Sequence, residues 1–347
     1  MTAITEIELK KLVKDLEKDS SNLDLINRVA IGYFENYEQK DDKEDYDYFE
    51  KAYNLRKTVK STHNFAWFLF YEWSEIEWRW NENSAIKKAL KIQKECIELR
   101  PKSYYPYFQY GDMLLNQKRF DEAIPYLEKA NQIKEKKVTT HNLGYCHFQL
   151  GNFEKASFLF TKAANENDRE KRSLFNLALS VFKMNQFEKV KTIADILKKE
   201  IKTDDHMTIS GYEIGLLFFL LKDYGASASC LLNQGLNRID LSVWPELSFA
   251  LYKTDRERWR QHILGSLEEL NDWVIEIENN HEDWEDSSEE EKQERLFEFK
   301  NDILKKQEIL SNGMIEPIPD LSNHLMEEDF GCLLFDCKRH GNIEDDN

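Results

Sequence analysis

The most constraining feature of this chain is a pattern of residues that recurs four times between Tyr104 and Gln234, at intervals of 33 to 37 residues. The copies read YPYFQYGDMLLNQKRFDEAIPYLEKA, VTTHNLGYCHFQLGNFEKASFLFTKA, RSLFNLALSVFKMNQFEKVKTIADIL and TISGYEIGLLFFLLKDYGASASCLLN. A period of this length is typical of stacked helical hairpins, because one hairpin buries its apolar face only against its neighbours. We therefore expect an all-α fold, an α-solenoid of helical hairpins.

Each copy has the same internal order of small, polar and aromatic residues. A first helix carries a small residue near its middle, and a short polar turn follows. An aromatic residue then opens a second helix, whose apolar residues continue at helical spacing. The small residue allows the second helix to cross the first closely. The residues predicted to pack the hairpins are Gly111, Gly144, Ala178, Gly215, Ala123 and Ala156.

This pattern resembles the tetratricopeptide repeat (TPR) family. The match is good over Tyr104–Leu197 and degenerate over Thr208–Gln234. The resemblance implies that paired antiparallel helices stack into a right-handed superhelix, with the first helices lining its concave face. It also implies a non-enzymatic scaffold or adaptor, which binds a peptide or a partner protein in the concave groove.

The repeat pattern weakens toward both ends of the chain, which predicts four segments. These are a degenerate, TPR-like hairpin region, the TPR array, a non-repeat helical and acidic capping segment, and an irregular tail with the short apolar run Phe330–Phe335. Their predicted boundaries are 1–60, 61–240, 241–310 and 311–347. Within the third segment, Ser288 and Glu291 have the spacing of a capping box and predict the start of a helix.

A column of amide side chains precedes the crossing point of the first helices. It contains Asn64, Asn142 and Asn176, with Gln109 in the same column. By resemblance to TPR proteins, this position faces the groove. A primary amide both donates and accepts hydrogen bonds, so it can pair with the backbone of an extended peptide whatever the peptide's side chains. The alternative is that these amides bond only to the neighbouring helix.

The same alignment places further side chains in the expected groove: Tyr105, Phe108, Asp112, His141, Tyr145, Arg172, Phe175, Leu179 and Tyr212. TPR domains that hold the C-terminal carboxylates of chaperones use lysines, an arginine and asparagines on successive inner faces. Here Phe108, Asp112 and Asn176 stand where basic or amide residues belong in that arrangement. We therefore do not expect a carboxylate clamp.

The excess negative charge is confined to the C-terminal end. Residues 255–347 hold 27 Asp and Glu against 10 Lys and Arg, a net charge of −17, which is that of the whole chain. Such a surface repels nucleic acid and anionic lipid and attracts basic proteins. It predicts no direct nucleic-acid or membrane binding. It also offers an alternative function, an antitoxin or immunity-type protein that neutralises a basic partner through this region, whereas a polar cap for the solenoid is the simpler explanation.

The remaining features predict no catalysis, no cofactor and no metal site. An odd number of cysteines, five, without a dense framework suits a reducing compartment, and the first residues lack a signal-peptide pattern, so a cytoplasmic location is expected. Cys332, Cys337 and His340 with His324 form an imaginable zinc site. The run between the cysteines is apolar, however, which favours a small docking segment. The sequence specifies neither the partner nor the oligomeric state.

Overall fold

Regular structure in the computed structural model is helical wherever the chain is described, and no strand occurs in those ranges. The structure describes residues 3–36, 44–74, 84–164, 171–200, 209–232, 245–279, 284, 287–328 and 331–337. The chain divides into two compact units. Unit 1 consists of residues 1–168 together with 326–347, and unit 2 consists of residues 169–325. The last segment of the chain therefore belongs to the unit that contains the first.

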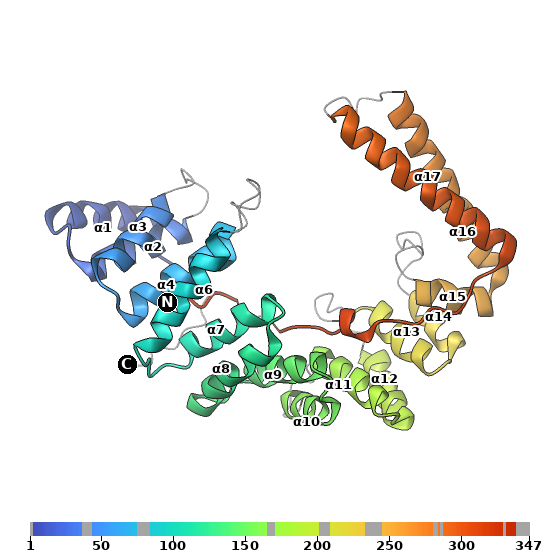
Figure 1. Ribbon diagram of the computed structural model, residues 1–347, viewed down its shortest axis with the longest axis horizontal. Coiled ribbons are helices and arrows are strands. Elements are labelled where there is room, and N and C mark those ends of the chain that lie inside the picture. Colours follow the sequence, from blue (N-terminus) through green and yellow to red (C-terminus); the bar gives the residue numbers. More distant parts are fainter. Residues whose placement is uncertain are drawn as a thin grey trace. The chain divides into compact units, whose positions relative to one another are not determined.

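Unit 1 is built from successive helices that pack in pairs (Figure 1). The pairs are α2 with α3, α4 with α6, α7 with α8, and α9 with α10. The helices are α1 (Glu6–Lys18), α2 (Leu23–Glu35), α3 (Glu44–Leu55), α4 (Val59–Phe68), its π-helical continuation η2 (Leu69–Trp73), α6 (Ser84–Glu98), α7 (Tyr105–Asn116), α8 (Phe120–Ile133), α9 (Lys137–Gln149) and α10 (Phe153–Ala164). These are the helical hairpins expected from the repeat.

The two most regular hairpins close on a glycine of the first helix. A Cβ atom added to Gly111 of α7 would lie 2.6 Å from Cγ of Leu127 on α8, and one added to Gly144 of α9 would lie 2.9 Å from Cε1 of Phe160 on α10. Ala123 on α8 is fully buried. Contacts this short leave no room for a larger side chain, so glycine sets how closely the paired helices approach.

The turn inside each hairpin also repeats, through its backbone conformation. Lys118, Gly151, Asn185 and Lys222 all have positive φ, between 56° and 77°. At the first of these turns, the amide of Lys118 donates to the carbonyl of Leu115 at 2.8 Å. A left-handed residue of this kind ends a helix by bonding its last free carbonyls, and glycine is the residue best suited to it. Only one of the four turns has glycine.

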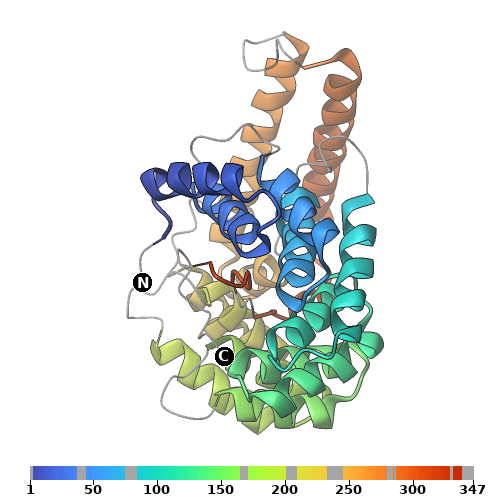
Figure 2. The same ribbon diagram turned by 90° about the vertical axis from the view of Figure 1, so that its left-hand side faces the viewer.

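Unit 2 continues with helices that also pack in succession (Figures 1 and 2). Its long final pair forms an antiparallel hairpin, and the predicted capping box of Ser288 and Glu291 is present at the start of its second helix. The elements are α11 (Lys171–Lys183), α12 (Phe187–Glu200), α13 (Gly211–Leu220), α14 (Tyr224–Leu232), α15 (Pro245–Thr254), α16 (Arg256–Glu278), α17 (Glu289–Asn312) and the 3-10 turn η5 (Leu321–Asn323).

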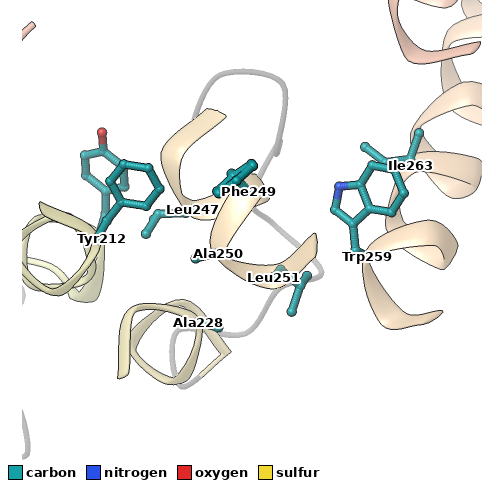
Figure 3. Packing of buried hydrophobic residues seen from close by; sticks show 9 residues of the cluster. Tyr212, Ala228, Leu247, Phe249, Ala250, Leu251, Trp259 and Ile263 are labelled. Atoms are coloured by element: carbon teal, nitrogen blue, oxygen red, sulfur yellow. The ribbon is translucent and has the colours of Figure 1, made fainter. Parts of the chain in front are cut away.

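Helix α15 joins the last repeat hairpin of unit 2 to the long hairpin. In Figure 3 its residues Leu247 and Ala250 lie between α13 and α14 on one side and Trp259 and Ile263 of α16 on the other. The indole Nε1 of Trp259 donates to the hydroxyl of Ser248 at 3.2 Å, so the buried ring also has its polar atom satisfied. The apolar cluster thus attaches the non-repeat helices to the array.

The described helices contain none whose length and apolar character would suffice for a bilayer crossing.

The glycine contacts lead to a matched pair of predictions. Gly111→Ala forces Cβ against the fully buried Leu127, and overpacking of this kind costs about 1–3 kcal/mol, against a gain of about 1 kcal/mol in helix propensity. We expect a net loss of stability of about 1 kcal/mol in urea unfolding. Gly265→Ala in α16, where nothing lies within 4 Å, should instead stabilise by about 0.5–1 kcal/mol. The same sign for both changes would contradict this packing.

Candidate functional site

Residues 326–328 and 331–337, here called the tail segment, lie against the first helices of two hairpins in unit 1 (red in Figure 1). Hydrogen bonds connect the tail segment to α4 and α9. The bonds join residues 185 to 271 positions apart in the chain. The tail segment therefore occupies the side of unit 1 to which the amide column was expected to point.

Asn142 of α9 binds the backbone of the tail segment through both ends of its amide. Its Nδ2 donates to the carbonyl of Glu328 at 3.0 Å, and its Oδ1 accepts from the amide of Glu328 at 3.2 Å. Asp112 of α7 assists, because its carboxylate accepts from the same Nδ2 at 3.3 Å. Because a carboxylate only accepts hydrogen bonds, this bond requires that the nitrogen of the Asn142 amide faces Asp112, and it so fixes the orientation of the amide.

Asn64 of α4 makes the same pair of bonds to another residue of the tail segment. Its Nδ2 donates to the carbonyl of Phe335 at 3.1 Å, and its Oδ1 accepts from the amide of Phe335 at 2.8 Å. Two asparagines from two hairpins thus hold two peptide residues by their backbone atoms. Because these bonds involve no tail side chain, they are independent of the tail's sequence.

The histidine before each asparagine adds a third bond. Nε2 of His141 bonds to the carbonyl of Met326, and Nε2 of His63 to the carbonyl of Leu333, each at 2.8 Å. A carbonyl only accepts, so both imidazoles carry their proton on Nε2. Each His–Asn pair therefore holds residues n and n+2 of the tail segment. In extended backbone these two residues face the same way.

Side chains of the tail segment contact the same face of unit 1. Leu333 and Leu334 are buried, at 2% and 0% exposure. The ring of Phe335 lies 4.7 Å from the imidazole of His63, and Lys60 Nζ lies 2.6 Å from Asp336 Oδ2. The tail segment is thus fixed by apolar burial and by an ion pair as well as by its backbone.

Three titratable groups at this contact, His63, Tyr145 and Glu327, have pKa values shifted toward their uncharged forms. Complete burial lowers the pKa of His63 to about 4, and its Nδ1 has no hydrogen-bond partner. Burial, reinforced by the nearby Glu327, raises the pKa of Tyr145 to about 12. Desolvation likewise raises the pKa of the Glu327 carboxyl, although the hydrogen bond with Tyr145 opposes the shift and part of the side chain is exposed. The face favours neutral hydrogen-bonding groups.

The structure brings together some of the predicted groove residues and separates others. Asn64, His141, Asn142 and Tyr145 contact the tail segment, and the ring of Tyr105 lies edge-on to Phe335 at 6.0 Å. Those located in unit 2 are Arg172, Phe175, Asn176 and Leu179 on α11 and Tyr212 on α13.

Two predicted groove residues of α7 lie inside the helical packing. Gln109 Nε2 donates to Gln93 Oε1 at 2.8 Å and to the carbonyl of His63 at 3.3 Å, and Phe108 is fully buried. The longer Gln side chain thus bonds to neighbouring helices, which is the alternative noted for this column.

His63, Lys60 and the identity of the occupant were not predicted from the sequence. A signal for the first was present, because the dipeptide His-Asn occurs in HNF at Asn64 and again in HNL at Asn142. Cys332 and Cys337 are buried with the tail segment, and no group of three metal-binding side chains occurs among the described residues. His340, the third residue of the imagined zinc site, lies outside the described residues.

One family model and several solved structures are similar to this chain. Residues 116–195 match the family model of anaphase-promoting complex (cyclosome) subunit 3. Among solved structures, the chain is similar to the APC/C hetero-tetramer Cut9-Hcn1 (TM-score 0.47, 16% identity, 70% of this chain and 46% of that chain). It is also similar to Pseudomonas aeruginosa PilF (TM-score 0.49, 17% identity, 69% of this chain and 100% of that chain). A further similar structure is YrrB, a TPR protein with an unusual peptide-binding site (TM-score 0.45, 15% identity, 56% of this chain and 94% of that chain). No curated protein matches the sequence significantly. The chain spans about half the length of the Cut9-Hcn1 chain that it matches.

The buried imidazole of His63 gives a pH prediction. Its pKa in the folded protein, about 4, lies below the ordinary 6.5, so the unfolded chain binds the extra proton first as the pH falls. The free energy of unfolding therefore keeps its full value above pH 6.5 and falls as the pH drops toward 4. For one such group the loss between pH 7 and pH 5 is about 2 kcal/mol. His63→Gln should remove this part of the loss in urea unfolding at the two pH values. His147 and His324, whose pKa values are also lowered by burial, titrate alike in both proteins. Equal losses for the two proteins would contradict the assignment.

Proposed function

On the premise that this chain is a tetratricopeptide-repeat protein, we propose that it is a protein-interaction scaffold whose unit 1 binds an extended segment of a partner protein. The binding face consists of Lys60, His63, Asn64, His141, Asn142 and Tyr145 on α4 and α9, and is called the tail-binding face below. The observation that carries the proposal is the repeated His–Asn pair, which holds two stretches of backbone by six hydrogen bonds.

These bonds fit a binding role because they replace the hydrogen bonds to water that a peptide backbone loses when it is buried against the protein. A peptide group buried without a partner costs about 1–3 kcal/mol, so a face that offers both a donor and an acceptor is selective for extended backbone. Burial of apolar side chains beside it supplies affinity. This mode resembles other peptide recognition, in which backbone bonds give affinity and side-chain positions give specificity.

The chemistry of the face also favours binding over catalysis. Burial keeps His63 neutral at physiological pH and raises the pKa of Cys146, on the same helix as Asn142, to about 12, so this thiol is not an activated nucleophile. All five cysteines are buried thiols outside any disulfide, which fits the proposed reducing, cytoplasmic location.

Capture of a basic partner by the acidic end stays a prediction. The contacts described there include ion pairs within the long hairpin, such as Lys300 with Glu278 at 2.7 Å. These pairs neutralise part of the acidic charge locally. No contact in the described ranges favours this second function over peptide binding.

Selection from a random library of 12-residue peptides tests the proposal. The target is the full chain carrying Leu333→Asp and Leu334→Asp, the tail-release variant, because two carboxylates at buried positions undock the tail segment. Adding Asn64→Ala and Asn142→Ala removes two amide bonds at each asparagine, worth about 1 kcal/mol each. The enriched peptides should therefore bind at least 30-fold more weakly.

Asn271→Ala in the same background is the matched control. Its amide donates to the carbonyl of Leu267 within α16, so peptide affinity should not change. Enriched peptides that bind equally well with and without Asn64 and Asn142 would overturn the proposal.

A further inference from the structure

We propose that the tail segment is an internal copy of the partner's recognition sequence: the partner presents a peptide containing Leu-Leu-Phe-Asp, and the tail segment withholds the tail-binding face from it until displaced. This inference rests on the proposed function, because it names the ligand of the same face. It follows from how the individual residues of the tail segment are held.

The backbone contacts define the length and register of the ligand. His141 and Asn142 hold residues 326 and 328, and His63 and Asn64 hold residues 333 and 335. The two pairs of contacts are seven residues apart in the tail segment. A ligand that engages both pairs therefore needs at least the ten residues from 326 to 335, and a turn begins at the end of that span.

The apolar contacts define three consecutive side chains. Leu333 and Leu334 point into protein, since both are almost fully buried, and Phe335 packs between the rings of His63 and Tyr105 at 4.7 and 6.0 Å. A charged residue at either leucine position would lose its water without gaining a partner. Leu334 also begins a turn, in which the amide of Cys337 donates to the carbonyl of Leu334 at 3.3 Å, so both leucines are buried where the ligand changes direction.

The charged contact defines the residue after phenylalanine. Lys60 Nζ lies 2.6 Å from Asp336 Oδ2, and 4.0 Å from Asp24 Oδ1 on α2. The lysine is about one-third exposed, so the pair contributes more to specificity than to affinity. An acidic residue at this position is therefore preferred over a neutral or a basic one.

The tail segment is a tethered and imperfect ligand, as displacement requires. Asp336 has φ of 72°, in the left-handed region that residues other than glycine rarely adopt. Tethering gives a flexible segment a local concentration that reaches the millimolar range, so even an imperfect sequence occupies its face. A free partner displaces the tail segment when its higher affinity for the face outweighs the high local concentration of the tethered tail.

Fluorescence anisotropy with a labelled peptide of residues 326–337 tests the inference. The tail-release variant should bind this peptide at least tenfold more tightly than the wild-type chain, whose own tail segment competes. Adding Asn64→Ala and Asn142→Ala should weaken binding at least 30-fold. A peptide of the same composition in scrambled order should not bind detectably.

A charge exchange tests the register. In the tail-release variant, Lys60→Glu should reverse the preference between the natural peptide and one carrying Asp336→Lys, by at least fivefold. Lys162→Glu is the matched control. Lys162 on α10 forms a similar exposed ion pair with Glu135, which lies between α8 and α9, and it contacts no tail residue that the structure describes. An unchanged preference in the Lys60→Glu variant would contradict the assigned register.

The outcomes separate this inference from the proposed function. Library peptides that bind through Asn64 and Asn142, while the tail peptide does not, would overturn the inference and leave the function standing. Failure of both kinds of peptide would overturn both. Equal affinity of wild-type and tail-release chains for the tail peptide would overturn the withholding role.

A second release variant guards against a folding defect in the first. Glu328→Pro with Phe335→Pro removes the two amide donors that bond to the asparagines and leaves every helix unchanged. Circular dichroism identifies which variant keeps its helices, and the same affinities are expected for it.

Discussion

A primary amide that donates to and accepts from one peptide residue is the interaction on which this account depends. Asn142 is aimed at the tail segment by the packing of its own hairpin. It lies two residues before Gly144, and two residues on an α-helix point about 200° apart. Because Gly144 faces Phe160 at the crossing of α9 and α10, the asparagine points away from that crossing. The close approach that folds the hairpin therefore also presents its binding group.

Neutrality of the buried polar groups is the second requirement. A charged imidazole at His63 would carry a second proton on Nδ1, which has no hydrogen-bond partner. Burying this charge in surroundings of low dielectric costs free energy, so the neutral ring is favoured. The neutral ring carries its one proton on Nε2 and donates a hydrogen bond from there to the carbonyl of Leu333. Histidine thus acts here as a fixed donor to backbone. The same pair recurs at His141 and Asn142, so two hairpins hold the tail segment with the same set of donors and acceptors.

Much of the fold could be predicted from the sequence, because hairpin packing is local and periodic. The repeat places the paired helices, and the capping box at Ser288 marks the start of α17. The apolar run between Cys332 and Cys337 was expected to dock, but its docking place could not be predicted, since the contacts join residues more than 180 positions apart and leave no periodic signal. Gln109 shares the asparagine column, yet its extra methylene lets it reach Gln93 instead. The polar turn that contains Lys118 was expected, but its left-handed conformation was not, because no glycine marks it.

Amide hydrogen exchange in the tail segment is the most direct test of the central claim. In the full wild-type chain, the amides of Glu328 and Phe335 donate to Asn142 and Asn64, so they should exchange far more slowly than in a free peptide of the same sequence. Replacing both asparagines with alanine should return these two amides to fast exchange while the helices stay protected. Free-peptide exchange rates at both amides in the wild-type chain would contradict the account.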